Sequence, residues 1–136
     1  DIENKATNVG SGLFGSLPEA MSEESFLTHL KQAMQLDCIR YTALRGKSIQ
    51  KVALCGGAGG FLLKQAIRKK ADIFITADYK YHEFFDADQN IIIADIGHFE
   101  SEQFTIDLLA EIMSDKFSNF EVRCTSVRTN PIHYWC

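Results

Sequence analysis

The chain is short of basic charge, of long apolar runs and of paired cysteines, and each shortage excludes a class of protein. Its 14 Lys and Arg residues are outnumbered by 18 Asp and Glu residues, which gives a net charge of -4. Binding to nucleic acid needs a clustered basic surface, so we do not expect nucleic acid as a partner. No segment approaches the roughly 20 apolar residues of a membrane span, and residues 1–5 do not resemble a signal peptide, so we expect no membrane partner either.

The four cysteines are scattered, and no two of them form a Cys-x-x-Cys pair. This spacing excludes a zinc ribbon and the dense disulfide framework of small secreted proteins. Cys38, Cys55 and Cys124 fall in apolar runs typical of strands, where a free cysteine behaves as a small buried hydrophobe. We therefore expect these three thiols to be reduced and buried, and the protein to be cytoplasmic.

Strand and helix patterns alternate along the 136 residues, which are enough for one domain with a real core. Residues 1–20 are rich in Gly, Ser and Asn and predict an irregular linker, which leaves residues 21–136 as the domain. Within it the hydrophobic spacing predicts helices over 22–36, 61–70 and 101–117, and strands over 38–42, 49–55, 71–76, 91–94 and 120–126. The expected fold is a three-layer α/β sandwich, with a largely parallel or mixed sheet and helices on both faces.

The most informative segment is residues 95–102, which directly follow the buried strand at 91–94. His98 and Glu102 lie at this strand-to-helix junction, four residues apart, which places both side chains on one face of a helix. An imidazole and a carboxylate on one face can share a metal ion, and in an open α/β sheet ligands bind at the carboxyl ends of strands. The alternative interpretation is a surface His beside a Glu that is favoured at the start of the helix by the helix dipole.

Two earlier strand ends also carry polar loops. Gly56, Gly57 and Gly59 follow one strand, in a turn that either holds an anion with its N–H groups or is merely tight. The turn departs from the dinucleotide-binding pattern, because Leu62 stands where that pattern has its third glycine. Asp78 and His82 follow the next strand and repeat the carboxylate-plus-imidazole spacing. Because parallel strands end at one edge of a sheet, we expect one polar pocket lined by the glycines, Asp78, His82, Asp95, His98 and Glu102.

These three loops, with their strands, resemble the C-terminal half of the NIF-three-like (Ngg-one-interacting-factor-three-like) proteins, usually labelled GTP cyclohydrolase 1 type 2 homologues. The resemblance covers about residues 51–131, and its motifs occur in the family's order at residues 52–59, 71–82 and 95–102. It implies two α/β halves around a dinuclear centre of divalent ions such as zinc, iron or manganese. His98 and Glu102 match the metal ligands of the family's Gly-His-x-x-Ser-Glu motif.

The same resemblance implies that part of the site lies outside this chain. The family's other ligands, two adjacent His residues and an Asp, belong to an N-terminal half, and the chain contains no His-His pair and no initiator Met. We therefore expect a C-terminal piece that holds no tight metal pair alone, whose partners are the missing N-terminal half and further copies in a homo-oligomer. Asp78 and His82 match the family's Thr-Gly-Asp-x-x-x-His segment, with Ala77 in place of the Gly, and are pocket residues rather than ligands.

Two functions follow from this resemblance. The first is a metal-dependent hydrolase acting on a nucleotide or another phosphate-bearing substrate, in which His98 and Glu102 hold metal, Asp78 or His82 moves protons, and the glycine turn holds an anion. The fragment alone would then be inactive. The alternative is a non-enzymatic metal-binding or regulatory protein that acts through assembly and protein interactions.

Overall fold

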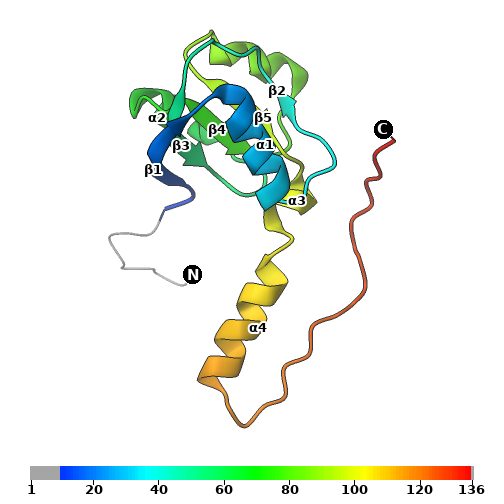
Figure 1. The fold of residues 1–136 in the computed structure, drawn as a ribbon. Coiled ribbons are helices and arrows are strands. Elements are labelled where there is room, and N and C mark those ends of the chain that lie inside the picture. Colours follow the sequence, from blue (N-terminus) through cyan, green and yellow to red (C-terminus); the bar gives the residue numbers. More distant parts are fainter. Residues whose placement is uncertain (1–9, 136) are drawn as a thin grey trace.

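The computed structural model describes residues 10–135, which form an α/β body from which one helix and a long tail extend (Figure 1). In chain order the elements are β1 (Leu13–Met21), α1 (Glu23–Ala33), β2 (Arg40–Tyr41), β3 (Ile49–Leu54), the 3₁₀ helix η1 (Gly60–Leu62), α2 (Leu63–Arg68), β4 (Ile73–Thr76), the 3₁₀ helix η2 (Tyr81–Ala87), β5 (Ile92–Asp95), α3 (His98–Glu102) and α4 (Thr105–Lys116). No described helix is both long and apolar enough to cross a membrane.

The five strands form one mixed sheet in the order β1-β3-β4-β5-β2. The three central strands are parallel, and the two edge strands are antiparallel to their neighbours. Thr76 pairs with Asp95, so β4 and β5 end level with each other. As predicted, the loops that follow β3, β4 and β5 therefore leave the sheet at the same edge.

Alternating side chains of the central strands supply two separate cores, one on each face of the sheet. On one face Ala53, Phe74 and Ile93 pack with residues of α2 and η2. On the other face Ile73, Ile75 and Ile92 pack with Phe26 and Leu30 of α1. Helices thus cover both faces, which confirms the predicted three-layer arrangement.

The irregular segment expected over residues 1–20 is wrong from Leu13 onward, where β1 begins. Leu13 pairs with Leu54 and Ser16 with Lys51, so β3 provides a hydrogen-bonding edge that the sequence pattern did not reveal. The register shifts between Ser16 and Met21, around Pro18, and an edge strand tolerates a proline and such an irregularity. Residues 1–9 lie outside the described part of the chain.

The predicted helix over 101–117 is divided into α3 and α4, and α4 extends away from the body (Figure 1). The strand predicted over 120–126 is also wrong, because this segment is irregular and pairs with neither edge of the sheet. Cys124 lies in it and is exposed rather than buried, whereas Cys38 is half-buried and Cys55 is buried. An apolar alternation forms a strand only where another strand offers it a free edge.

Candidate metal-binding site at the carboxyl end of the sheet

His98 and Glu102 face each other from successive turns of α3, at the edge where the parallel strands end. Gly97 links β5 to α3 with a φ of +90°, and the helix then presents both side chains on one side. The distance from His98 Nε2 to Glu102 Oε1 is 3.5 Å. Two ligands of one tetrahedral ion with bonds of 2.0–2.2 Å lie about 3.4 Å apart. The pair is therefore spaced as the sequence led us to expect for a shared metal ion, although its metal role stays a prediction.

Asp78 contacts the other nitrogen of the same imidazole. Its Oδ2 lies 2.7 Å from His98 Nδ1, although the two residues are 20 positions apart. Asp78 follows β4 and has a left-handed backbone, with a φ of +54°, which aspartate tolerates better than most residues. The hydrogen bond that the His98 ring donates to Asp78 raises the pKa of His98. Burial opposes this rise, and the nearby negative charges of Asp78 and Glu102 add to it.

This arrangement has the form of a carboxylate-supported metal ligand. When His98 is neutral and Nδ1–H donates to Asp78, Nε2 carries the lone pair and points toward Glu102. Metal-binding histidines commonly hold a carboxylate on the nitrogen that does not bind the metal, which fixes the tautomer and the orientation of the ring. The described side chains thus fit a divalent ion, with His98 and Glu102 as ligands and Asp78 behind them.

Gly57 lies directly against this pair. A Cβ atom on Gly57 would lie 2.7 Å from Glu102 Oε1 and 3.4 Å from His98 Nε2, and the φ of Gly57 is +64°. Its N–H donates to Ser101 Oγ at 2.8 Å, and its carbonyl accepts from Thr76 Oγ1 at 3.2 Å. The glycine turn therefore makes room for the side chains of His98 and Glu102.

Two of the three glycine N–H groups expected to hold an anion are occupied. The Gly57 amide donates to Ser101, and the Gly59 amide donates to Thr76 Oγ1 at 2.9 Å. A Cβ atom on Gly59 would meet Cys55 and Thr76, whereas one on Gly56 would lie 3.9 Å from Glu102 Cγ. Of the two interpretations that the sequence left open, the contacts favour a tight turn with close packing.

Asp95 joins the loops that carry the site. Its Oδ2 accepts from the Tyr79 amide at 2.9 Å, and its Oδ1 accepts from the Gly97 amide at 3.0 Å. It also forms an ion pair with Arg40 of β2. The buried carboxylate thus ties the loop of Asp78 to the loop of His98. The expectation that Asp95 lines the pocket is wrong, because Asp95 is buried and supports the loops from behind. The sequence did not reveal Arg40 as its partner, nor Thr76 and Ser101 as partners of Gly57, although Ser101 stands next to Glu102 in the motif.

His82 is not part of this cluster. It lies in η2 and is exposed, and its ring packs against that of Tyr81 at a centroid distance of 5.1 Å. The four-residue spacing from Asp78 to His82 therefore does not repeat the pairing in α3, because Asp78 precedes η2 and points to His98 instead. Its predicted proton-transfer role stays a prediction without a supporting contact.

A pocket of about 450 Å³ adjoins the candidate ligands. It is lined by His98 and Glu102 together with residues of the C-terminal tail. Its lining residues are His98, Phe99, Glu102, Gln103, Ile106, Thr129, Asn130, Pro131 and Ile132. The pocket is thus lined by residues that precede α4 in the sequence, by Ile106 of α4, and by residues of the tail that follows α4.

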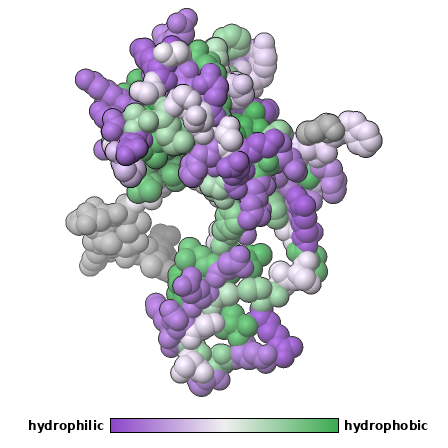
Figure 2. All heavy atoms as spheres, in the orientation of Figure 1, coloured by the Kyte–Doolittle hydropathy of each residue, from purple (hydrophilic) through white to green (hydrophobic). Residues whose placement is uncertain are grey.

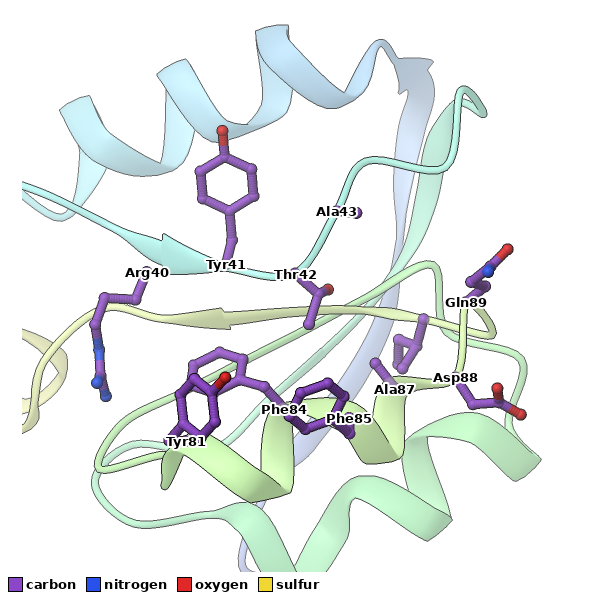
Figure 3. A pocket seen from close by; sticks show the side chains of 11 residues that line it. Arg40, Tyr41, Thr42, Ala43, Tyr81, Phe84, Phe85, Ala87, Asp88 and Gln89 are labelled. Atoms are coloured by element: carbon purple, nitrogen blue, oxygen red, sulfur yellow. The ribbon is translucent and has the colours of Figure 1, made fainter.

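A second hollow, of about 610 Å³, lies between β2 and η2 (Figure 3). The rings of Tyr81, Phe84 and Phe85 form its η2 side, and the ring of Tyr41 points away from them. Its charged lining residues are Arg40, which is paired with Asp95, and Asp88. This hollow therefore offers aromatic surface but no set of groups for proton transfer or metal binding.

Across residues 10–135, no group of three or more His, Cys, Asp and Glu side chains is arranged to hold a metal ion. His98 and Glu102 are the pair that converges, and Asp78 is turned to the opposite nitrogen of the imidazole. A closed structural metal site needs four ligands. The described residues thus offer two candidate ligands and not a complete ligand set.

The chain resembles bacterial proteins of more than twice its length. It is 34% identical to a GTP cyclohydrolase 1 type 2 homolog of Staphylococcus epidermidis over 137 aligned positions, which cover 96% of the chain and 37% of that relative. A protein of the same name from Staphylococcus aureus is 28% identical, and 98% of the chain covers 38% of it. The chain thus spans about 37% of the length of the curated relative from S. epidermidis.

Solved structures of similar proteins share the fold. A Bacillus cereus protein related to NIF3 superposes with a TM-score of 0.79 at 30% identity, over 93% of this chain and 36% of that protein. Reduced HcgD from Methanocaldococcus jannaschii superposes with a TM-score of 0.63 at 24% identity, which shows likeness of fold alone. The family model of Duf34/NIF3 matches residues 2–131. The chain therefore belongs to the Duf34/NIF3 (NGG1p interacting factor 3) family.

Proposed function

We propose that the chain is the C-terminal part of a metal-dependent hydrolase that acts on a nucleotide or another phosphate-bearing substrate. The observation that carries this proposal is the geometry of His98, whose Nδ1 contacts Asp78 while Nε2 faces Glu102 at 3.5 Å. Relatives that carry the name GTP cyclohydrolase 1 type 2 homolog support a nucleotide as the substrate.

Each residue of the cluster has a distinct role in this proposal. His98 and Glu102 hold the ion, and Asp78 orients the imidazole rather than moving a proton, because its carboxylate is engaged with Nδ1. Gly57 keeps the space beside both ligands open. A bound divalent ion supplies Lewis acidity and lowers the pKa of a water molecule that it binds.

The remaining ligands, and the second ion of a dinuclear centre, are proposed to come from the N-terminal half that the longer relatives contain. His98 and Glu102 face each other as ligands of one ion would, and the described residues contain no group of three or more such side chains that could hold a metal ion. Two ligands completed by water hold an ion weakly. The isolated chain is therefore expected to bind no stoichiometric pair of ions and to show little or no hydrolysis. The complete protein, in the cytoplasm, is expected to bind two ions and to hydrolyse its substrate.

Metal content and phosphate release, measured on the complete protein and its variants, test this function. His98→Ala and Glu102→Ala are expected to lose at least one ion per chain by mass spectrometry and to lose hydrolysis of GTP. His29→Ala is the matched control, because His29 is an exposed histidine on α1. Full metal content in both site variants would contradict the assignment.

A second candidate is a non-enzymatic metal-binding or regulatory protein that acts as a homo-oligomer. It is favoured by the apolar side chains that α4 leaves exposed; Figure 2 shows them as green spheres in the lower part of the molecule, alongside polar ones. Such a surface suits assembly with the N-terminal half or with further copies. Metal bound by His98 and Glu102 without hydrolysis of nucleotides or phosphate esters would favour this candidate.

A further inference from the structure

The pocket beside His98 and Glu102 has a mixed lining. The candidate ligand pair contributes polar groups, and Ile106, Pro131 and Ile132 contribute apolar surface. Its volume of about 450 Å³ lies within the range of small-molecule sites. A molecule that binds the metal through one group can therefore contact apolar surface with its remaining atoms.

The tail that forms part of this surface is held in place by a buried hydrogen bond. Asn130 Nδ2 donates to Glu100 Oε1 at 3.0 Å, and the two residues are 7% and 6% exposed. Asn130 Oδ1 accepts from the Ile132 amide at 3.0 Å, which shapes the turn at Pro131. In addition, the Arg128 guanidinium lies over the Phe99 ring, 5.6 Å from its centroid.

The Asn130 amide and Nε2 of Gln103, which line the pocket, are engaged within the protein. Both atoms of the Asn130 amide are bonded, and Gln103 Nε2 donates to the Met34 carbonyl at 2.8 Å. Ile106, Pro131 and Ile132 provide apolar lining surface beside them. This part of the lining is suited to an apolar group.

We propose that residues 129–132 determine specificity, as a wall of the pocket that Asn130 fixes to α3. This wall contacts an apolar ring of the substrate, while His98 and Glu102 hold the metal that binds the anionic group of the substrate. The substrate class is thus a phosphate monoester, or a comparable oxyanion, joined to an aromatic or other flat apolar group. This inference rests on the proposed function. It assigns Ile132 to specificity and Asn130 to positioning.

Two probes that differ only in the apolar group test the inference on the zinc-loaded complete protein. Phenyl phosphate and methyl phosphate carry the same anion, and inorganic phosphate reports on the metal alone. The unaltered protein is expected to bind phenyl phosphate more tightly than methyl phosphate. Ile132→Ala and Asn130→Ala should reduce this preference by about fivefold or more, because part of the apolar wall is lost or released.

Val127→Ala is the matched control, because Val127 lies in the same tail, is 69% exposed and does not line the pocket. It should keep the preference of the unaltered protein, and all three variants should keep the affinity for inorganic phosphate. The inference would be overturned by an unchanged preference in Ile132→Ala, or by an equal loss of affinity for both esters, even if metal and inorganic phosphate still bind. If the unaltered protein binds neither zinc nor inorganic phosphate, the proposed function is wrong, and the inference fails with it.

Discussion

The Asp78 carboxylate lies 2.7 Å from Nδ1 of His98, and this contact determines which ring nitrogen is available to a ligand. Without it, the proton of a neutral imidazole could rest on either nitrogen. With it, the proton stays on Nδ1, and Nε2 is left facing Glu102. Asp78, in the loop after β4, thereby determines the tautomer of His98, which follows β5.

Asp78→Asn should weaken zinc binding at His98 by about 10–100-fold, the usual cost of losing a carboxylate behind a metal-binding histidine. It should also lower the pKa of His98 toward its ordinary value of 6.5, because the hydrogen bond that raises the pKa is weakened. Calorimetric titration with zinc and an NMR titration of the imidazole measure the two effects. Asp115→Asn, on exposed α4, is the control and should change neither quantity.

Gly57→Ala should abolish zinc binding, because the added methyl group would lie 2.7 Å from Glu102 Oε1 and close to His98 Nε2. The positive φ adds a conformational cost of about 1–2 kcal/mol. Gly46→Ala separates the two effects, since Gly46 has a similar φ of +69° and nothing within 4 Å of the added atom. Both variants should lose stability in urea, but only Gly57→Ala should lose zinc. Equal zinc affinities in the two variants would disprove the role assigned to Gly57.

Much of the site could be predicted from the sequence, because its main pairing is local. His98 and Glu102 are one helical turn apart, and a helix that starts there brings them together whatever surrounds it. Asp78 could be placed at the same edge of the sheet from the rule that parallel strands end at one edge. Its contact with Nδ1, however, depends on the left-handed conformation of Asp78, which no spacing encodes.

The features that the sequence did not reveal all depend on distant partners. The Gly57 amide is used by Ser101, 44 positions away, so a turn that suggests an anion site has its N–H group engaged inside the protein. Residues 13–21 have a weak strand pattern, and it is β3 that makes them a strand. The tail shows the reverse, because residues 120–126 have a strand pattern but pair with no strand in the described structure.

The raised pKa of His98 predicts opposite responses of stability and metal binding to pH. A pKa raised on folding stabilises the metal-free fold fully below the ordinary value of 6.5, and this contribution is lost as the pH rises through the folded pKa. The effect is small because His98 and Asp78 are about half exposed. Zinc affinity should instead rise with pH, by up to about tenfold per pH unit below that pKa, because zinc displaces the proton.

Urea denaturation and zinc titration at about pH 6 and about pH 8.5 measure both responses, on either side of the ordinary histidine range. Because other groups also titrate, the informative quantity is the difference between the unaltered chain and Asp78→Asn. That difference in stability should shrink at the higher pH. A difference that grows with pH would mean that Asp78 does not stabilise the protonated imidazole.

The apolar surface of α4 predicts that the isolated chain associates with itself. Ile106, Leu109 and Met113 lie on one side of the helix and Leu108 and Ile112 on the adjoining side, and all five are exposed. Apolar patches of this kind are uncommon on monomers and mark surfaces that other protein segments cover. A second copy can cover them in the absence of the proposed N-terminal half.

Light scattering should therefore give a mass above the 15.3 kDa of one chain. The double variant Leu109→Glu with Met113→Glu should restore the monomer, because it places two charges within the apolar surface. Ser114→Glu adds a charge on the side of the helix occupied by Asp107 and Glu111, and should leave the association unchanged. A chain that is monomeric at high concentration would show that the α4 surface needs no partner, and would weaken the case that the N-terminal half packs there.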